Sequence, residues 1–245
     1  MNGRIQRHDA ASARLALPRV GKIKIGKKAT SRNGKEYPTS VDYFIPDGKY
    51  AGLFTQVYGD RPQTIEIIFP DDDPAKVCCE YYEYRDDKGQ LIAKGDGVTF
   101  DVWTGQKYEQ FTTEKYPDIM QRIQSKTPNA AARSTGDGWR VRLTLTFFIP
   151  LVRGIAGLWT FETNGSASSI PAIRDAFDAM LAAKGYVKGL IFDLHVRFAQ
   201  SQKPNDKSRY PVVTLVPNAS ADAVQKIKNA LTQQNILPKT CVTEN

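Results

Sequence analysis

Two stretches in the second half of the chain alternate between apolar residues and residues that are mostly polar. In residues 140–149 the apolar parity comprises Val141, Leu143, Leu145, Phe147 and Ile149. In residues 190–198 it comprises Leu190, Phe192, Leu194, Val196 and Phe198. Successive side chains of a strand point to opposite faces, so each stretch predicts a strand with one buried and one solvent-facing side. Strands of this kind are typical of antiparallel sheets, which constrains the chain to an architecture built on such a sheet.

Shorter patterns predict the remaining elements. Strands are expected at 20–25, 64–69, 77–84, 91–94, 158–163 and 210–216, because each run is apolar or alternating and bounded by turn residues. Helices are expected at 49–58, from Pro117, from Ser168 or Ser169 to Gly185, and from Ser220, where capping residues precede an apolar stripe. Residues 26–38 are read as a basic loop. The segregated elements predict an α+β fold, mainly antiparallel sheet in two halves with a few short helices.

The chain divides into five expected segments. A flexible basic arm at 1–17 precedes a β-rich N-terminal half at 18–124, and a polar linker at 125–138 leads to an α+β C-terminal half at 139–236 and a tail at 237–245. The boundary is placed at 125–138 because small and polar residues dominate that stretch. An oligomer is compatible with this organisation.

Positive charge is concentrated at the start of the sequence. Residues 1–35 hold ten basic residues and one acid, Asp9, whereas the rest of the chain holds 24 basic and 25 acidic residues. A cationic segment before a neutral body is typical of proteins that bind a polyanion, because phosphate contacts release counterions. The alternative is a solvated leader that aids solubility. We expect nucleic acid to be the partner.

The cysteine count and the hydropathy favour the cytoplasm. Only Cys78, Cys79 and Cys241 are present, which does not suit a secreted disulfide framework. No stretch approaches the roughly 18 apolar residues of a membrane helix, and the basic N-terminus lacks the apolar core of a signal peptide. We therefore expect a protein of the bacterial cytoplasm that has no membrane partner.

Catalytic and metal motifs are not recognisable in the sequence. His8 and His195 are the two histidines, and neither stands in a motif for nucleophilic catalysis. No C-x-x-C or H-x-x-x-H spacing indicates zinc. The triplet Asp71-Asp72-Asp73 could hold a divalent cation, but a polar turn before Pro74 is favoured. We expect a non-enzymatic protein without cofactor, metal or catalytic residue.

Basic and aromatic residues outline a candidate nucleic-acid surface. Arg140 and Arg142 share the polar parity of one strand and Arg197 that of another, so a shared sheet would place them in one basic patch. Exposed rings would let bases of a single strand stack, with Tyr82 and Tyr84 on one parity as candidates. The predicted nucleic-acid-binding residues are Arg19, Lys22, Lys24, Lys27, Lys28, Arg32, Lys35, Tyr82, Tyr84, Arg140, Arg142 and Arg197.

The order of segments resembles a known phage family. Residues 21–28 (GKIKIGKK), the turn at Tyr58-Gly59 and Pro62, the turn Gly95-Asp96-Gly97, and the strand at 161–163 leading through serines into a helix are similar to the recombination directionality factor-like proteins. The likeness covers about residues 18–218. Many relatives carry a cysteine cluster after the Gly-Asp-Gly turn, and residues 98–140 contain none here, so no metal site is expected from the resemblance.

The resemblance implies a phage or prophage protein with a binding role. Our leading expectation is an accessory of replication or recombination that binds DNA, single strands in preference to duplex. An alternative is a directionality factor that binds a serine integrase, or another phage recombination protein, and switches the integrase to excision. A third alternative is an inhibitor of a host protein, in which the basic arm meets an acidic protein surface.

Overall fold

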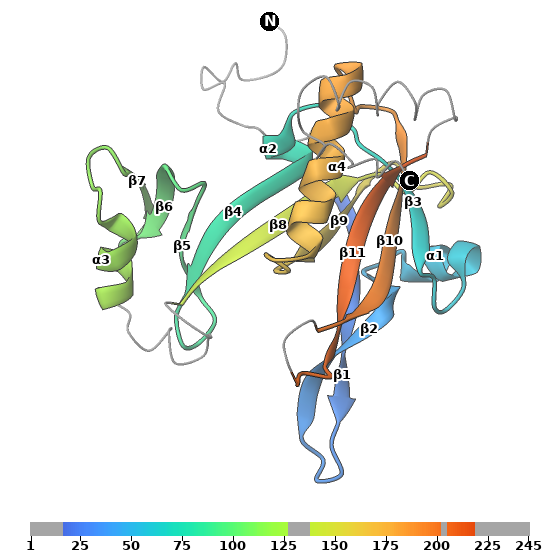
Figure 1. Cartoon of the computed structure of the whole chain (residues 1–245), viewed down its shortest axis with the longest axis horizontal. Coiled ribbons are helices and arrows are strands. Elements are labelled where there is room, and N and C mark those ends of the chain that lie inside the picture. The colour runs from blue at the N-terminus through green and yellow to red at the C-terminus, as the bar shows by residue number, and fades with distance from the viewer. Residues whose placement is uncertain (1–16, 127–137, 202–204, 219–245) are drawn as a thin grey trace, which may run out of the picture.

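The computed structural model describes residues 17–126, 138–201 and 205–218 (Figure 1). Eleven strands and four helices are found in these residues. The strands are β1 (Arg19–Thr30), β2 (Glu36–Asp47), β3 (Thr64–Ile68), β4 (Cys78–Arg85), β5 (Leu91–Gly95), β6 (Thr99–Trp103), β7 (Tyr108–Thr112), β8 (Trp139–Phe147), β9 (Leu158–Thr163), β10 (Ile191–Gln200) and β11 (Arg209–Pro217). The helices are α1 (Ala51–Tyr58), α2 (Pro74–Val77), α3 (Ile119–Lys126) and α4 (Ser169–Lys184).

The strands form two sheets. The larger has the order β2-β1-β9-β8-β4-β5-β6-β7, and the smaller has the order β11-β10-β3. All neighbouring strands are antiparallel except β1 and β9, which are parallel. The predicted α+β fold with a mainly antiparallel sheet is therefore confirmed.

Strands from both sides of residues 127–137 pair within each sheet. In the larger sheet β1 pairs with β9 and β4 with β8, and in the smaller sheet β3 pairs with β10. Ser125 and Lys126, which the sequence placed in the linker, close helix α3. The rest of that linker up to residue 137, the arm before Leu17, the helix expected from Ser220 and the tail at 237–245 lie outside the described residues.

The main core lies between the larger sheet, the smaller sheet and α4, which crosses one face of β4 and β8 (Figure 1). The apolar parity of β8 points into this core, as its alternation predicts. Trp159 of β9 is 1% exposed and packs 6.0 Å from Phe54 of α1 between ring centroids. Its ring occupies the space where a Cβ atom of residue 21 would lie, so Gly21 makes this packing achievable.

A second core supports the far end of the larger sheet. Strands β5, β6 and β7 and helix α3 form a small lobe next to the end of β4. Its buried residues are Tyr84 of β4 together with Ala93, Phe100, Ile119 and Ile123. The turn Gly95-Asp96-Gly97 connects β5 to β6 within this lobe. The Asp96 carboxylate accepts hydrogen bonds from the backbone N–H groups of Val98 (2.8 Å) and Thr99 (2.7 Å), an Asx turn that fixes the β5–β6 connection.

The sequence prediction was wrong where the chain leaves the core. Residues 26–38, read as a loop, continue β1 to Thr30 and begin β2 at Glu36, and β2, β6 and β7 were not predicted. Beyond Gly26 both faces of the β1–β2 ribbon carry mostly exposed residues. A ribbon without a buried side has no apolar alternation, so the pattern that identifies a strand is missing there.

The aspartates at 71–73 serve the turn predicted for them. Asp72 accepts hydrogen bonds of 2.7 Å from the backbone N–H groups of Val187 and Lys188, which join this turn to the segment after α4. Asp73 caps α2 by accepting a hydrogen bond from the Ala75 N–H. Each carboxylate, Asp71 with Lys76 included, thus has a partner within the protein.

Candidate nucleic-acid interface

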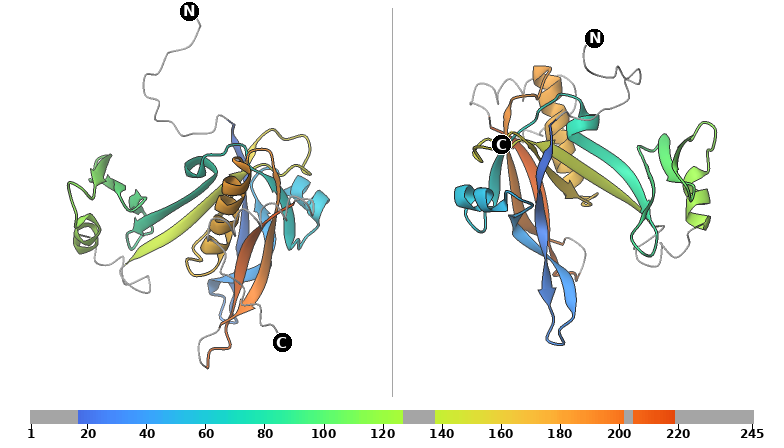
Figure 2. Two further views of the ribbon diagram at one scale, coloured as in Figure 1. Left: turned by 45° about the horizontal axis from the view of Figure 1, so that its top comes forward. Right: turned by 180° about the vertical axis from the view of Figure 1, so that it is seen from behind.

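The ends of two hairpins project from the body of the molecule. After Ile23 the parallel register of β1 with β9 ends, and from Gly26 onward β1 is paired with β2 alone. In the same way β10 is paired with β3 up to His195 and with β11 alone beyond it. Both hairpins extend in one direction, and β2 contacts β10 and β11 (Figures 1 and 2). We call residues 26–40 and the described residues of 197–210 the basic prong.

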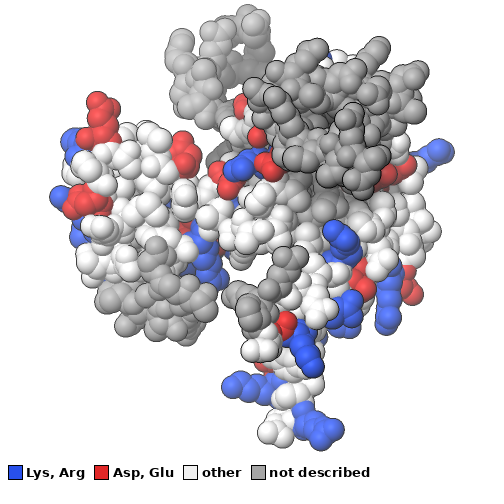
Figure 3. Space-filling model, in the orientation of Figure 1, with Lys and Arg blue, Asp and Glu red and all other residues white. Residues whose placement is uncertain are grey.

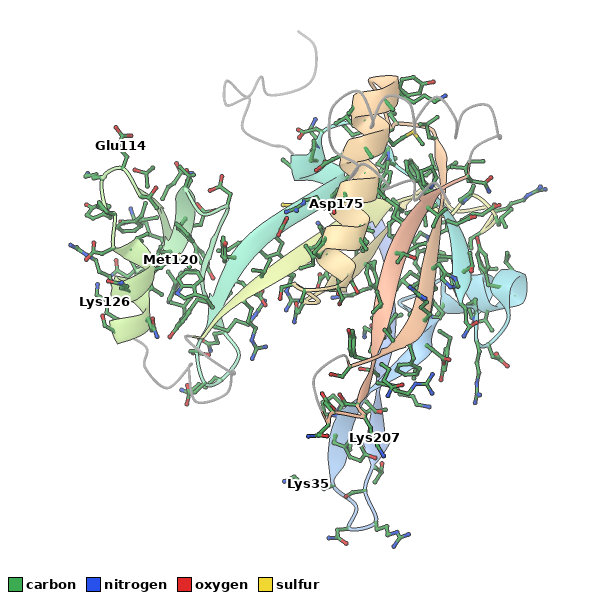
Figure 4. All side chains as sticks on the ribbon, in the orientation of Figure 1. Lys35, Glu114, Met120, Lys126, Asp175 and Lys207 are labelled. Atoms are coloured by element: carbon green, nitrogen blue, oxygen red, sulfur yellow. The ribbon has the colours of Figure 1, made fainter. Side chains whose placement is uncertain are left out.

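Cations dominate the basic prong. Its exposed basic side chains are Lys27, Lys28, Arg32, Lys35, Arg197, Lys207 and Arg209, against the acids Glu36 and Asp206 in its described residues. Figure 3 shows this gathering of Lys and Arg at the lower end of the molecule, and Figure 4 places Lys35 and Lys207 there. The pair between Lys28 and Glu36 is highly exposed, so water screens it and Lys28 stays available to a ligand.

Two exposed tyrosines accompany these cations. Tyr37 of β2 is 49% exposed and Tyr210 of β11 is 40% exposed. The guanidinium of Arg209 lies 5.4 Å from the ring centroid of Phe198 on the neighbouring strand, which orients that charge on the ribbon. A row of cations with open π faces is the combination that binds the backbone and bases of a nucleic-acid strand.

Five of the predicted binding residues lie in the prong: Lys27, Lys28, Arg32, Lys35 and Arg197. Sequence reasoning missed Lys207, Arg209, Tyr210 and Tyr37. The first three had a visible signal, a basic and aromatic run at the start of a predicted strand. Tyr37 had none, since its segment was read as a loop.

Lys22 and Lys24 lie at the base of the prong and are paired with carboxylates. Lys24 forms an ion pair with Asp47 across the β1–β2 ladder, and the hydrogen bond from Lys24 lowers the pKa of Asp47 below its ordinary value. The ammonium of Lys22 donates a 2.7 Å hydrogen bond to Glu162 of β9. Lys22 thus connects the root of the hairpin to β9, and Lys24 connects the two strands of the hairpin to each other.

Arg142 of β8 is part of a buried charge network. Its guanidinium donates to Glu83 at 2.6 Å and to Glu162 at 2.9 Å, and only 18% of the side chain is exposed. Burial by itself would raise the pKa of Glu83, but hydrogen bonds from Arg142 and Arg85 outweigh it and hold that pKa below its ordinary value. Arg142 therefore serves the cohesion of the sheet more than its surface.

The expected patch of Arg140, Arg142 and Arg197 does not form. Arg140 and Arg142 lie in the larger sheet and Arg197 in the smaller one, because β8 and β10 belong to different sheets. Arg140 is exposed at the start of β8, near the small lobe. Arg19 lies at the start of β1, at the other end of this strand from the prong, and lines a hollow described below.

The two tyrosines of β4 that were predicted to bind, Tyr82 and Tyr84, have different surroundings. Tyr82 is 36% exposed, whereas Tyr84 is fully buried and its ring centroid lies 5.1 Å from that of Trp139. Tyr84 therefore offers no face for stacking, which corrects its assignment to the surface. The shared parity was right, but the small lobe covers this face where β4 reaches Tyr84.

Comparison with known protein families gives a match over most of the chain. A family model described as Gp3-like, recombination directionality factor-like, matches residues 20–218. No curated protein and no solved structure matches the chain. Among the described residues there is no helix long and apolar enough to cross a membrane.

Proposed function

Because the chain belongs to the recombination directionality factor-like family of phages, we propose that it is a non-enzymatic accessory of recombination or replication that binds DNA through the basic prong. The observation that carries the proposal is the projection of seven exposed cations, with Tyr37 and Tyr210, on two adjacent hairpins. Cations supply affinity by releasing counterions from phosphates, and the exposed rings favour single strands, whose bases are free to stack.

The test compares two matched variants in a gel-shift assay with single-stranded and duplex oligonucleotides. The prong variant carries Lys27, Lys28, Arg32 and Lys35 changed to Gln, and the control carries the same change at four exposed lysines elsewhere, Lys88, Lys107, Lys115 and Lys184. We expect the prong variant to lose at least tenfold in affinity and the control to stay close to wild type. Equal losses in both would show that net charge, not the prong, governs retention.

A second candidate function has its own observation in the small lobe. Trp103 and Tyr108 are 39% and 48% exposed, with ring centroids 5.2 Å apart, beside an apolar groove of about 280 Å³ between β6 and α3. Exposed Trp and Tyr next to an apolar groove are typical of protein–protein hot spots. This surface supports the alternative that the protein binds a recombinase such as a serine integrase.

The two functions are separated by location. In a pull-down with the purified integrase, Trp103→Ala should remove complex formation and leave oligonucleotide binding unchanged. The prong variant should show the reverse. If Trp103→Ala retains the integrase as wild type does, the small lobe is not its docking surface.

A further inference from the structure

A hollow of about 500 Å³ lies on the face of the larger sheet opposite α4. Its floor is formed by β8, whose polar parity presents Thr144 and Thr146 there while the apolar parity faces the core. Its walls come from the start of β1, from α2, and from β4, β5 and β9. The volume is in the range of sites for small molecules.

Cations outnumber acids in the lining of this hollow. Arg19, Lys76 and Lys94 line it together with one carboxylate, Glu162. The charge of Glu162 is already balanced by Lys22 at 2.7 Å and Arg142 at 2.9 Å. The hollow is therefore electropositive.

Two of the lining cations are left for a ligand. Lys76 pairs with Asp71 at 3.1 Å and with Asp73 at 3.6 Å. Arg19 and Lys94, by contrast, have no carboxylate within ion-pair distance in the described part of the chain. Because both cations line one hollow, they favour an anion inside it.

Lys94 is held in place by a ring. Its ammonium lies 3.7 Å from the centroid of Tyr81, and the Tyr81 hydroxyl is 3.2 Å from the hydroxyl of Thr144. The cation–π contact orders the lysine before any ligand arrives, which lowers the entropy cost of binding. Hydroxyl donors at the floor and cations at the walls are the groups that bind phosphate.

We propose that this hollow binds a phosphate monoester of nucleotide size, with Lys94 as the cation that contacts the phosphate and Arg19 as a second unpaired cation in the lining. A phosphate monoester carries close to two negative charges at neutral pH, which matches two unpaired cations. The monoester can come from a free nucleotide or from the 5′ end of a DNA strand. This site lies on another face from the basic prong and does not depend on the function proposed for it.

The first experiment is calorimetric titration of the full chain with deoxyadenosine monophosphate at low salt, with deoxyadenosine as the uncharged control. We expect the monophosphate to bind and the nucleoside to give no signal. Lys94→Gln and Arg19→Gln should each weaken binding at least tenfold, Lys94→Arg should stay within about threefold of wild type, and Lys88→Gln, outside the hollow, should have no effect. Circular dichroism checks that each variant is folded. If Lys94→Gln does not fold, the binding affinity of Arg19→Gln is used to test the proposal.

The second experiment identifies the source of the phosphate. Oligonucleotides with a 5′ phosphate and with a 5′ hydroxyl are compared on wild type and on Lys94→Gln. A preference for the phosphorylated strand that Lys94→Gln removes assigns the hollow to DNA ends. Equal binding of both strands, with the monophosphate still bound, assigns it to free nucleotides.

The proposal is overturned if folded wild type binds neither the monophosphate nor phosphorylated ends, or if both Gln variants bind as wild type does. The prong variant separates this result from the proposed function. It should lose oligonucleotide affinity and keep the monophosphate.

Discussion

Arg142 of β8 donates a 2.6 Å hydrogen bond to Glu83 of β4, a carboxylate of which only 1% of the side chain is exposed. The same guanidinium donates a hydrogen bond of 2.9 Å to Glu162 of β9. Glu162 also accepts a hydrogen bond of 2.7 Å from the ammonium of Lys22 of β1. A continuous chain of charges thus crosses four neighbouring strands of the larger sheet. It links the root of the prong to the strands that carry the small lobe.

Removing the centre of this network should be costly. Arg142→Met leaves the buried carboxylate of Glu83 with the partly exposed Arg85 as its remaining ion-pair partner. We expect a loss of about 1–3 kcal/mol in the free energy of unfolding, measured by urea denaturation, because Glu83 loses one of its two cationic partners. Arg153→Met, at an exposed loop position, should change it by less than about 0.5 kcal/mol. Similar small losses in both variants would contradict a structural role for the network.

The network also predicts how stability depends on pH. Burial opposes ionisation of Glu162, but hydrogen bonds from Lys22 and Arg142 prevail and lower its pKa below the ordinary value of 4.5. A carboxyl with a lowered pKa in the folded state stabilises the fold above its unfolded pKa, and this contribution is lost as the pH falls below about 4.5.

The melting temperature of wild type should therefore fall more between pH 6 and pH 3 than that of Glu162→Gln. At pH 3 the two melting temperatures should be similar. Glu36→Gln, at an exposed ion pair, serves as the control and should follow wild type. If the difference in melting temperature between wild type and Glu162→Gln stays constant over this pH range, the carboxylate of Glu162 does not stabilise the fold by its charge.

Gly21 is predicted to be required by the ring of Trp159. A methyl group at this position would overlap that ring, so Gly21→Ala should lower the free energy of unfolding by about 1–3 kcal/mol. Gly52 in α1 has open space at the same position, and Gly52→Ala should raise stability by about 0.4–1 kcal/mol. Urea denaturation of both variants checks the contrast, and equal effects would refute the packing argument.

Stacking on the prong can be tested apart from its charge. Tyr37→Ala and Tyr210→Ala should each weaken binding of a single-stranded oligonucleotide by about 1–3 kcal/mol, while duplex binding changes little. Tyr186→Ala, which removes a ring of similar exposure in the segment after α4, is the control. Equal effects on single strands and duplex would mean that these rings do not stack on bases.

The sequence could predict the elements that have a buried side. The alternation in β8 and β10 and the apolar stripe of α4 were sufficient, because one face of each element contacts the core. The strand segments of the β1–β2 ribbon in the basic prong could not be predicted, since a solvated ribbon has no such alternation. Tyr84 was assigned to the surface because parity shows which residues share a face, while what covers that face depends on strands distant in sequence.

The pairing of distant strands also determined which cations cluster. Arg142 and Arg197 have similar strand patterns, yet β8 and β10 lie in different sheets. The β10–β11 hairpin, with Lys207 and Arg209 at its end, lies beside the β1–β2 hairpin because β2 contacts β10 and β11, and no local pattern encodes this contact. The excess of positive charge in residues 1–35 was visible in the sequence. The position of a second basic hairpin, β10–β11, beside it was not.

Contacts between the basic prong and DNA phosphates are tested by the salt dependence of DNA binding by wild type. Fluorescence anisotropy with a labelled single-stranded oligonucleotide gives the association constant at several salt concentrations. If four to seven cations of the prong contact phosphates, its logarithm should fall linearly with that of the salt concentration, with a slope of roughly −3 to −5. Absence of binding in dilute buffer, or binding that salt does not weaken, would show that the cations of the prong do not contact DNA phosphates.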